Sequence, residues 1–276
     1  MDEAAARSEI RRFLAEDVGR GDITTELTVP TGRPGTARIE AREGCVVAGI
    51  EVARWCFEEL EGDLEWRPEV VDGDELRAPG ILTRLSTDLG SILTIERTAL
   101  NLLGRMSAIA TQARRYVAAV AATPARIVDT RKTTPGLRMF ERYAVRVGGA
   151  SNHRFGLDDG ILIKDNHIAA AGGVSEAVRR ARAGAPHGLK VEVEVTDLAQ
   201  LDEALSAGAD AVLLDNMDVR TTTEAVQQAG GKVLLESSGG ITLENVGAYA
   251  ETGVDLISVG ALTHSVRTID VALELE

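Results

Sequence analysis

Aromatic residues, lysine, cysteine and long apolar segments are all scarce in this chain of 276 residues. Only 3% of the residues are aromatic, which leaves few side chains on which nucleic-acid bases could stack. The formal net charge of −13 repels phosphate backbones and anionic lipid headgroups. We therefore expect neither a nucleic acid nor a membrane as a partner. With 44% hydrophobic residues the chain can still bury a large core, so general disorder is excluded.

The two cysteines and the first residues of the chain predict a cytoplasmic protein. Cys45 and Cys56 lack the spacing of a metal site, and we expect free thiols in a reducing compartment. No apolar run approaches the roughly 20 residues of a membrane helix. The opening residues, Met1-Asp2-Glu3, are acidic where a signal peptide would be basic.

Lysine accounts for only four of the 30 basic residues: Lys132, Lys164, Lys190 and Lys232. Excess acid with few lysines would suit a high-salt cytoplasm, although a GC-rich genome alone would also favour arginine. In either case, each of the few lysines in this chain is a stronger candidate for a functional role than a lysine usually is.

The hydrophobic pattern changes along the chain. The first part, up to about residue 88, predicts a mixed α+β segment with helices over 3–17 and 51–60, a strand, turn and strand over 36–48, and strands over 64–70 and 81–86. A helical stretch follows over 89–120, and Gly104 is expected to loosen it. From residue 125 onward, short apolar strands alternate with helix-length segments, at 126–128, 161–163, 191–195, 211–214, 233–235 and 256–259. This βα repeat predicts a parallel sheet with right-handed crossovers.

Polar residues directly follow these strands or end them. They are the segments 129–132, 164–166, 215–216 and 236–238, with Glu194, Ser258 and Gly260. Functional groups at the carboxyl ends of successive strands are typical of a β/α-barrel active site, whereas an open doubly wound sheet would concentrate them at one switch point. We therefore expect a barrel; about six strands are clear, so its closure is an inference.

A block of cations and histidines occupies residues 131–167 of this acidic chain. It comprises Arg131, Lys132, Arg138, Arg142, Arg146, His153, Arg154, Lys164 and His167. The three arginines between 138 and 146 fit a solvated helix face. Arg131, Lys132 and Lys164 lie at strand ends, where arginine supplies a fork and lysine a point charge for carboxylate or phosphate. We expect a pocket for a substrate with several negative charges.

Two carboxylates, Glu194 and Asp215, lie at other strand ends. The alternation in residues 191–195 places valines on one face and Glu192 and Glu194 on the other, so both glutamates would point into the barrel. Glu192 would lie deep and need a partner, while Glu194 would lie near the mouth. Carboxylates beside a cationic pocket suit sugar hydroxyls or a hydrated divalent cation, and structural salt bridges to the cations are the alternative.

Small residues follow the last two strands, in Ser237-Ser238-Gly239-Gly240 and Gly260-Ala261. Backbone N–H groups there can approach a phosphate closely, although such turns often only reverse the chain. Nucleophilic catalysis is poorly supported, because neither cysteine lies in the barrel half and no Gly-x-Ser-x-Gly elbow occurs. A zinc site is not supported either, because no His/Cys grouping has zinc-ligand spacing. A Schiff base on Lys164 is disfavoured, since nearby carboxylates and an anionic substrate would keep the amine charged.

Longer motifs run through both halves of the chain. They are residues 21–24 (GDIT), 96–101 (ERTALN), 130–138 (TRKTTPGLR), 152–157 (NHRFGL), 162–168 (LIKDNHI), 191–195 (VEVEV), 214–216 (LDN), 236–240 (ESSGG) and 259–265 (VGALTHS). In these motifs the chain resembles the quinolinate phosphoribosyltransferases over nearly its whole length. It departs from the family pattern at Val147, where cysteine is expected, and at Ala150-Ser151, where glycine is usual. Neither departure removes a charged group.

The resemblance implies an α/β fold: an incomplete, seven-stranded β/α barrel at residues 106–264, preceded by an N-terminal α/β sandwich domain at residues 1–105, to which the tail at about 265–276 returns. It implies a homodimer with active sites at the subunit interface, and a requirement for Mg²⁺. The reaction would join quinolinate to phosphoribosyl pyrophosphate. It would give nicotinate mononucleotide, pyrophosphate and carbon dioxide, in NAD biosynthesis.

The resemblance also implies the residues of the site. Lys132, Lys164, Glu194 and Asp215 would be catalytic, and the two carboxylates would hold the ribose hydroxyls and the Mg²⁺ shell. Arg97 would be contributed across the dimer interface. The substrate-binding set would comprise all of these with Thr130, Arg131, His153, Arg154, Ser238, Gly239, Gly240, Gly260, Ala261, Leu262 and His264. Since the ring nitrogen of quinolinate is the nucleophile, the protein would mainly contribute positioning and electrostatics.

Three alternatives stay open. A paralogue with this fold would act on a different pyridine or small acid. A barrel lyase would form a Schiff base on Lys164. A non-catalytic protein would only sense the same anions.

Overall fold

The computed structural model of the protein describes residues 1–60 and 63–276, which form two compact units. The N-terminal unit consists of Met1–Arg114, Thr133–Gly149 and Thr263–Glu276, and the barrel unit consists of Arg115–Lys132 and Ala150–Leu262. Within the part of the chain that the structure describes, no helix is long and apolar enough to cross a membrane.

The N-terminal unit combines helices with a four-stranded antiparallel sheet of order β12-β1-β5-β3. Its helices are α1 (Glu3–Val18), α2 (Ile23–Thr28), α3 (Ile50–Glu58), most of α4 (Leu89–Ala119) and α5 (Arg138–Val147), and α11 (Ala261–His264) begins in the barrel unit. Its strands are β1 (Pro34–Ala41), β2 (Cys45–Val46), β3 (Glu65–Pro68), β4 (Glu75–Leu76), β5 (Gly80–Asp88) and β12 (Val271–Leu275). The turn at Glu43-Gly44 separates β1 from β2 as predicted, but β2 pairs with β4 in a separate ribbon.

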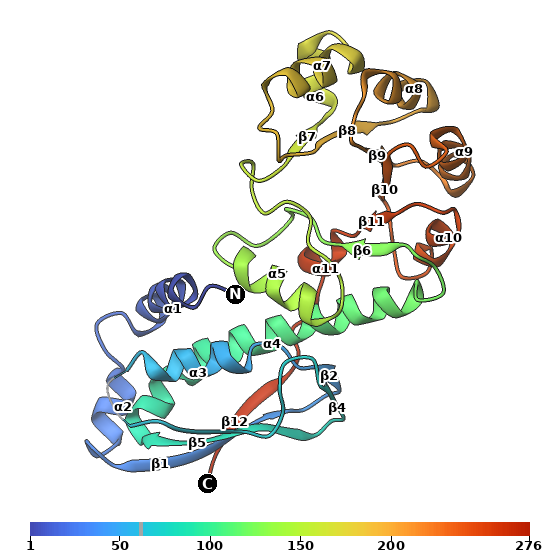
Figure 1. Ribbon diagram of the computed structural model, residues 1–276. Helices are drawn as coiled ribbons and strands as arrows, with labels where there is room; N and C mark the ends of the chain where they lie inside the picture. The colour runs from blue at the N-terminus through green and yellow to red at the C-terminus, as the bar shows by residue number, and fades with distance from the viewer. Residues whose placement is uncertain (61–62) are drawn as a thin grey trace. The chain divides into compact units, whose positions relative to one another are not determined.

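One face of the four-stranded sheet packs against helices α3 and α4 (Figure 1). Side chains of β1 alternate, so Ala37, Ile39 and Ala41 are buried while their neighbours are not. Close to Gly35, the start of α4 approaches the strand so tightly that a Cβ atom would lie 3.0 Å from the Cδ1 of Ile92. This packing forms the core of the unit.

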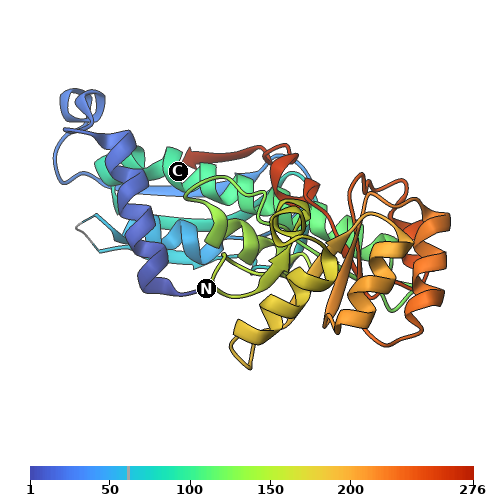
Figure 2. The ribbon, with the colours of Figure 1, turned by 90° about the horizontal axis from the view of Figure 1, so that it is seen from above.

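The last strand of the chain lies beside β1. β12 pairs with it in antiparallel register, from Ala37 opposite Leu275 to Ala41 opposite Val271. Both ribbon views place this red strand along the blue strand from the start of the chain (Figure 1, Figure 2). The N-terminal unit is therefore assembled from three separate stretches of sequence.

Helix α4 is continuous for 31 residues, so the expected loosening at Gly104 is wrong. The glycine allows close packing instead. A Cβ atom at Gly104 would lie 2.7 Å from the carbonyl oxygen of Ile269, and the N–H of Ile269 donates to the carbonyl of Gly104 at 3.2 Å. The absence of a side chain at Gly104 therefore allows the backbone at Ile269 to pack against the helix and does not bend it.

The barrel unit is a parallel sheet in the order β6-β11-β10-β9-β8-β7, with helices outside it (Figure 1). Its strands are β6 (Arg126–Val128), β7 (Ile161–Ile163), β8 (Val191–Val195), β9 (Ala211–Asp215), β10 (Leu234–Ser238) and β11 (Leu256–Ser258). Its helices are α6 (Asp165–Ala171), α7 (Val174–Gly184), α8 (Leu198–Ala207), α9 (Val219–Ala229) and α10 (Val246–Glu251). The order follows the chain from β7 to β11 and then returns to β6, as in a barrel.

The β/α-barrel prediction is confirmed, and the ring is incomplete between β6 and β7. The described residues form six barrel strands rather than seven. At the seventh place Ser151 makes an isolated parallel bridge to Val128. Its N–H donates to the carbonyl of Ile127 at 2.8 Å, and its carbonyl accepts from the N–H of Asp129 at 3.1 Å. A single residue therefore replaces the extra strand.

Candidate functional site

The carboxyl ends of the barrel strands surround a cavity of about 490 Å³, and every residue that lines it belongs to the barrel unit. The predicted site residues in its wall are Thr130, Arg131, Lys132, His153, Arg154, Lys164, Glu194, Asp215, Ser238, Gly239 and Gly240. The other lining residues are Leu162, Leu213, Asn216, Glu236 and Ser258. The structure therefore brings the strand-end cations, the two predicted carboxylates and one of the two glycine-containing turns into one place.

Strand β8 supplies an acidic wall of this cavity. Its three valines are buried, and Glu192 and Glu194 on the opposite face are partly exposed. Because a strand rises about 3.3 Å per residue, Glu192 lies roughly 7 Å below Glu194 along the strand. Glu194 Oε2 accepts a hydrogen bond from Lys164 Nζ at 3.1 Å. The ammonium group of Lys164 is half exposed, so the pair can separate at low cost when a substrate anion arrives.

Lys164 occupies the junction between β7 and α6. Its backbone N–H donates to Nδ1 of His167, which lies in the first turn of the helix, at 2.9 Å. This bond fixes the backbone from which the lysine side chain leaves the strand. His167, which the sequence groups with the cations, accepts a hydrogen bond here.

Asn216, in the turn after β9, packs so closely against the turn after β10 that only glycine fits at position 239. Asn216 has a positive φ of 54°, its side chain donates to Asp215 Oδ2 at 2.9 Å, and its N–H donates to the carbonyl of Ser238 at 2.8 Å. A Cβ atom on Gly239 would lie 2.2 Å from the side-chain oxygen of Asn216. Gly239 is therefore required by packing as well as by its φ of 93°.

His153 has both ring nitrogens engaged inside the protein. Nδ1 accepts a hydrogen bond from the N–H of Arg154 at 2.7 Å. Nε2 lies 3.3 Å from Glu192 and 3.5 Å from Glu236. The backbone N–H of His153 donates to Oδ1 of the buried Asp129 at 2.7 Å. This geometry indicates that His153 orders the segment that carries Arg154, besides lining the cavity.

Burial and neighbouring charges shift the pKa values of Glu236, His153 and Arg154. Burial, followed by the charge of Glu192, raises the pKa of Glu236 to about 7. The hydrogen bond to Glu192 raises the pKa of His153, against the opposing effect of burial. Burial and the nearby Arg131 lower the pKa of Arg154. The predicted need of Glu192 for a partner is met by His153.

The carboxylates predicted to hold magnesium line the same cavity. Mg²⁺ usually takes one or two carboxylates together with water and substrate phosphates, so Glu194 and Asp215 fit an ion that arrives with its substrate. Among the described residues, His153, Glu192 and Glu236 also bring one nitrogen or oxygen atom each within 4.8 Å of one another, and His153 and Glu236 line this same cavity. The predicted pair and this trio are different sets.

Five predicted residues lie outside the lining of this cavity. Arg97 is exposed on the part of α4 that belongs to the N-terminal unit. His264 is exposed, and its Nδ1 lies 2.6 Å from Ser265 Oγ. Leu262 is fully buried. Gly260 and Ala261 are partly exposed after β11. For all five, substrate binding stays a prediction.

The expected solvated arginine face on α5 is wrong for two of its three residues. Arg142 is only 7% exposed. Arg138 is partly buried and donates to Thr133 Oγ1 at 2.9 Å. Only Arg146 is exposed, and it lies over the ring of Tyr143. The helix belongs to the N-terminal unit rather than to the barrel.

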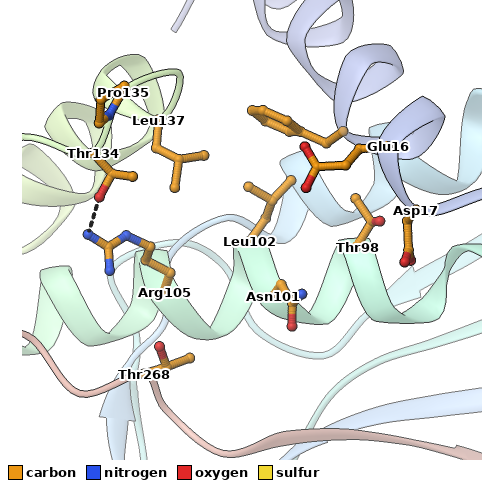
Figure 3. Close-up of a pocket in the computed structure, with 11 residues that line it drawn as sticks. Glu16, Asp17, Thr98, Asn101, Leu102, Arg105, Thr134, Pro135, Leu137 and Thr268 are labelled. Carbon is orange, nitrogen blue, oxygen red and sulfur yellow. Dashed lines mark hydrogen bonds between the residues drawn. The ribbon is translucent and has the colours of Figure 1, made fainter.

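A second cavity, of about 530 Å³, lies in the N-terminal unit (Figure 3). Glu16 and Asp17 from α1 face Thr98 and Asn101 from α4 across it. Its one cation, Arg105, points to Thr134 and donates to its hydroxyl at 3.0 Å. One cation faces two carboxylates in this wall, whereas the wall of the barrel cavity carries four cations, Arg131, Lys132, Arg154 and Lys164. The second cavity therefore suits a polyanion less well than the one in the barrel.

Sequence reasoning missed Glu236 and Asn216 as parts of the site. Glu236 alternates with Ser238 along β10, so the rule that places Glu192 beneath Glu194 would also have placed Glu236 beneath Ser238. Asn216 follows Asp215 directly. Its role depends on a contact with the next turn, which no local pattern reveals.

Comparison with known proteins identifies relatives along the whole chain. The model of the quinolinate phosphoribosyl transferase N-terminal domain matches residues 22–107, and that of the C-terminal domain matches residues 109–274. A nicotinate-nucleotide pyrophosphorylase (carboxylating) from Mycobacterium leprae is 50% identical over 98% of this chain and 97% of its own length. A quinolinate phosphoribosyltransferase (decarboxylating) from Nicotiana tabacum is 38% identical over 97% of this chain and 81% of its own length. The solved nicotinate-nucleotide pyrophosphorylase of Francisella tularensis is 39% identical, with a TM-score of 0.94 over 100% of this chain and 98% of its own.

Proposed function

The chain belongs to the quinolinate phosphoribosyl transferase family, and from this we propose that it transfers the phosphoribosyl group of phosphoribosyl pyrophosphate to quinolinate. The products are nicotinate mononucleotide, pyrophosphate and carbon dioxide, and the reaction serves NAD biosynthesis. The observation that carries the proposal is the single cavity in which Arg131, Lys132, Arg154 and Lys164 meet Glu194 and Asp215.

The two substrates repel each other, because quinolinate is a dicarboxylate and its partner carries a phosphate and a pyrophosphate. The cations of the cavity offset this repulsion and hold both close together. The ring nitrogen of quinolinate attacks the anomeric carbon of the ribose as pyrophosphate leaves. Glu194 and Asp215 bind the ribose hydroxyls and stabilise the positive charge that develops at that carbon.

Magnesium is part of the proposal. When bound, Mg²⁺ neutralises charge on the departing pyrophosphate. Glu194 and Asp215 would hold it, directly or through water. The Lys164 ammonium, which is 3.1 Å from Glu194, orients that carboxylate.

The proposed assembly is a homodimer in which Arg97 serves the active site of the partner. Arg97 is an exposed cation on a helix of the N-terminal unit, whereas the residues that line the barrel cavity all belong to the other unit. Because the side chain of Arg97 is exposed, its guanidinium is accessible to an anion.

The direct test mixes the protein with Mg²⁺, phosphoribosyl pyrophosphate and quinolinate and measures nicotinate mononucleotide and carbon dioxide. We expect both in equal amounts. Folded protein that binds both substrates without turnover would instead support the sensor. Covalent trapping of Lys164 by borohydride would support the lyase.

A further inference from the structure

Loss of carbon dioxide creates a chemical requirement that none of the residue roles assigned above meets. When the bond between the ring carbon and its carboxylate breaks, the electron pair remains on the ring carbon. The product carries hydrogen at that carbon, so one proton must be delivered there. The inference below rests on the proposed function, since only the decarboxylating reaction needs this proton.

Glu236 lies at the floor of the barrel cavity. It is the third residue of β10 and shares a face with Ser238, which places it about 7 Å deeper than the turn predicted to hold phosphate. Its side chain is 1% exposed. Among the described residues, neither of its carboxyl oxygens makes a hydrogen bond of ordinary geometry. A buried carboxyl with unused oxygens at a cavity wall is costly unless it has a purpose.

The trio of His153, Glu192 and Glu236 is better suited to a proton than to a metal ion. Nδ1 of His153 accepts a hydrogen bond from the N–H of Arg154, so the ring keeps its proton on Nε2. Nε2 is the nitrogen that faces both carboxylates, at 3.3 and 3.5 Å. A nitrogen that carries a proton cannot ligate a metal. Two carboxylates that face one N–H group therefore favour a second proton on one of them.

We propose that Glu236 is the acid that delivers the proton to the ring carbon after carbon dioxide leaves. The O–H bond of its carboxyl group breaks, the electron pair on the ring carbon forms the new C–H bond, and Glu236 is left as a carboxylate. Water restores its proton between turnovers. The position fits this role, because Arg131 and Arg154, the cations suited to the carboxylates of quinolinate, line the same cavity.

Burial and the surrounding charges support a protonated Glu236 near neutral pH. Burial, followed by the charge of Glu192 on β8, raises the pKa of Glu236 to about 7; His153 and Ser258 oppose this rise, and Asp129 after β6 adds a smaller one. The reactive form is the acid. The rate of proton delivery should therefore fall as pH rises through about 7.

The test compares Glu236→Gln with wild type in rapid-quench experiments. Glutamine keeps the volume and the burial but has no acidic proton. Ser237→Ala is the matched control, since Ser237 is the next residue on β10, is buried, and lies outside the cavity lining. For Glu236→Gln we expect pyrophosphate release in the first turnover to persist. Formation of nicotinate mononucleotide should fall about 100-fold. The nucleotide that still carries both carboxylates should accumulate.

Three results would overturn the proposal. One is a Glu236→Gln enzyme whose nucleotide formation stays within about twofold of wild type. Another is an equal loss of pyrophosphate release and nucleotide formation, which would indicate a structural or binding role. A third needs no variant: the single-turnover rate of wild-type nucleotide formation should decline between about pH 6 and pH 8, and a flat profile would exclude this acid. If wild type makes no nicotinate mononucleotide, the proposed function itself fails.

Discussion

Replacing Lys164 with alanine should separate the cost to catalysis from the cost to folding. The side chain of Lys164 is 48% exposed and lies 3.1 Å from Glu194, whose side chain is 13% exposed. Water reaches the pair from the lysine side, so it resembles a surface ion pair. Exposed pairs contribute about 0–1 kcal/mol to the free energy of unfolding. For a chain of this size, that corresponds to a fall in Tm of at most about 4 °C. A charge-assisted hydrogen bond to substrate is worth about 1.5–3 kcal/mol, so kcat/KM should fall roughly 10- to 100-fold or more.

The measurement is steady-state kinetics for both substrates together with thermal melting. Lys164→Arg keeps the charge but replaces a point donor with a planar fork, so it should recover little activity. Lys232→Ala, at an exposed turn before β10, is the control for the loss of a lysine and should match wild type. Near-normal kinetics in Lys164→Ala would refute the assigned role. Loss of the fold with no specific kinetic effect would instead show that the lysine mainly pairs with Glu194.

Three further predictions concern the acceptor, the assembly and the turn after β10. Because the cation cluster suits two carboxylates, quinolinate should greatly outperform nicotinate in initial-rate assays, and comparable turnover would contradict a decarboxylating enzyme. Inactive Arg97→Ala and Lys164→Ala proteins should regain activity when mixed, since some mixed dimers keep one intact site; no recovery despite demonstrated subunit exchange would count against a shared site. Gly239→Ala should lower the free energy of unfolding by about 1–3 kcal/mol more than the control Gly240→Ala does. Both glycines have a positive φ, 93° and 62°, so both variants carry backbone strain, but only at position 239 would the Cβ atom lie 2.2 Å from the side-chain oxygen of Asn216; at position 240 it would meet nothing within 4 Å. Equal melting of the two variants would argue against the steric conflict.

The strand-end groups could be predicted because a βα repeat fixes their position by connectivity alone. Once β7, β8, β9 and β10 are recognised as parallel, Lys164, Glu194, Asp215 and Ser238 must lie at the same edge of the sheet. The alternation in β8 likewise fixed which face carries the glutamates. These inferences need only local periodicity and chain order.

The features that escaped prediction all depend on contacts between distant segments. The sequence alone predicts that Gly104 loosens its helix, because the close contact with the backbone of Ile269 appears only in the structure. The sequence alone predicts that Arg142 lies at the surface, and only the packing of α5 shows that it is buried. Nε2 of His153 faces Glu192 on β8 and Glu236 on β10, and no spacing in the sequence predicts that arrangement.

The pairing of β12 with β1 has a consequence for biosynthesis. β1 leaves the ribosome early, but its outer neighbour in the sheet consists of residues 271–275. The edge of β1 must therefore stay unpaired while the whole barrel unit is translated, and an open strand edge invites pairing with other chains. The barrel can fold during that interval, because its strands pair mainly with neighbours close in sequence. Nascent chains stalled before residue 271 should thus show a protease-resistant barrel and a sheet that is still open to capture by chaperones.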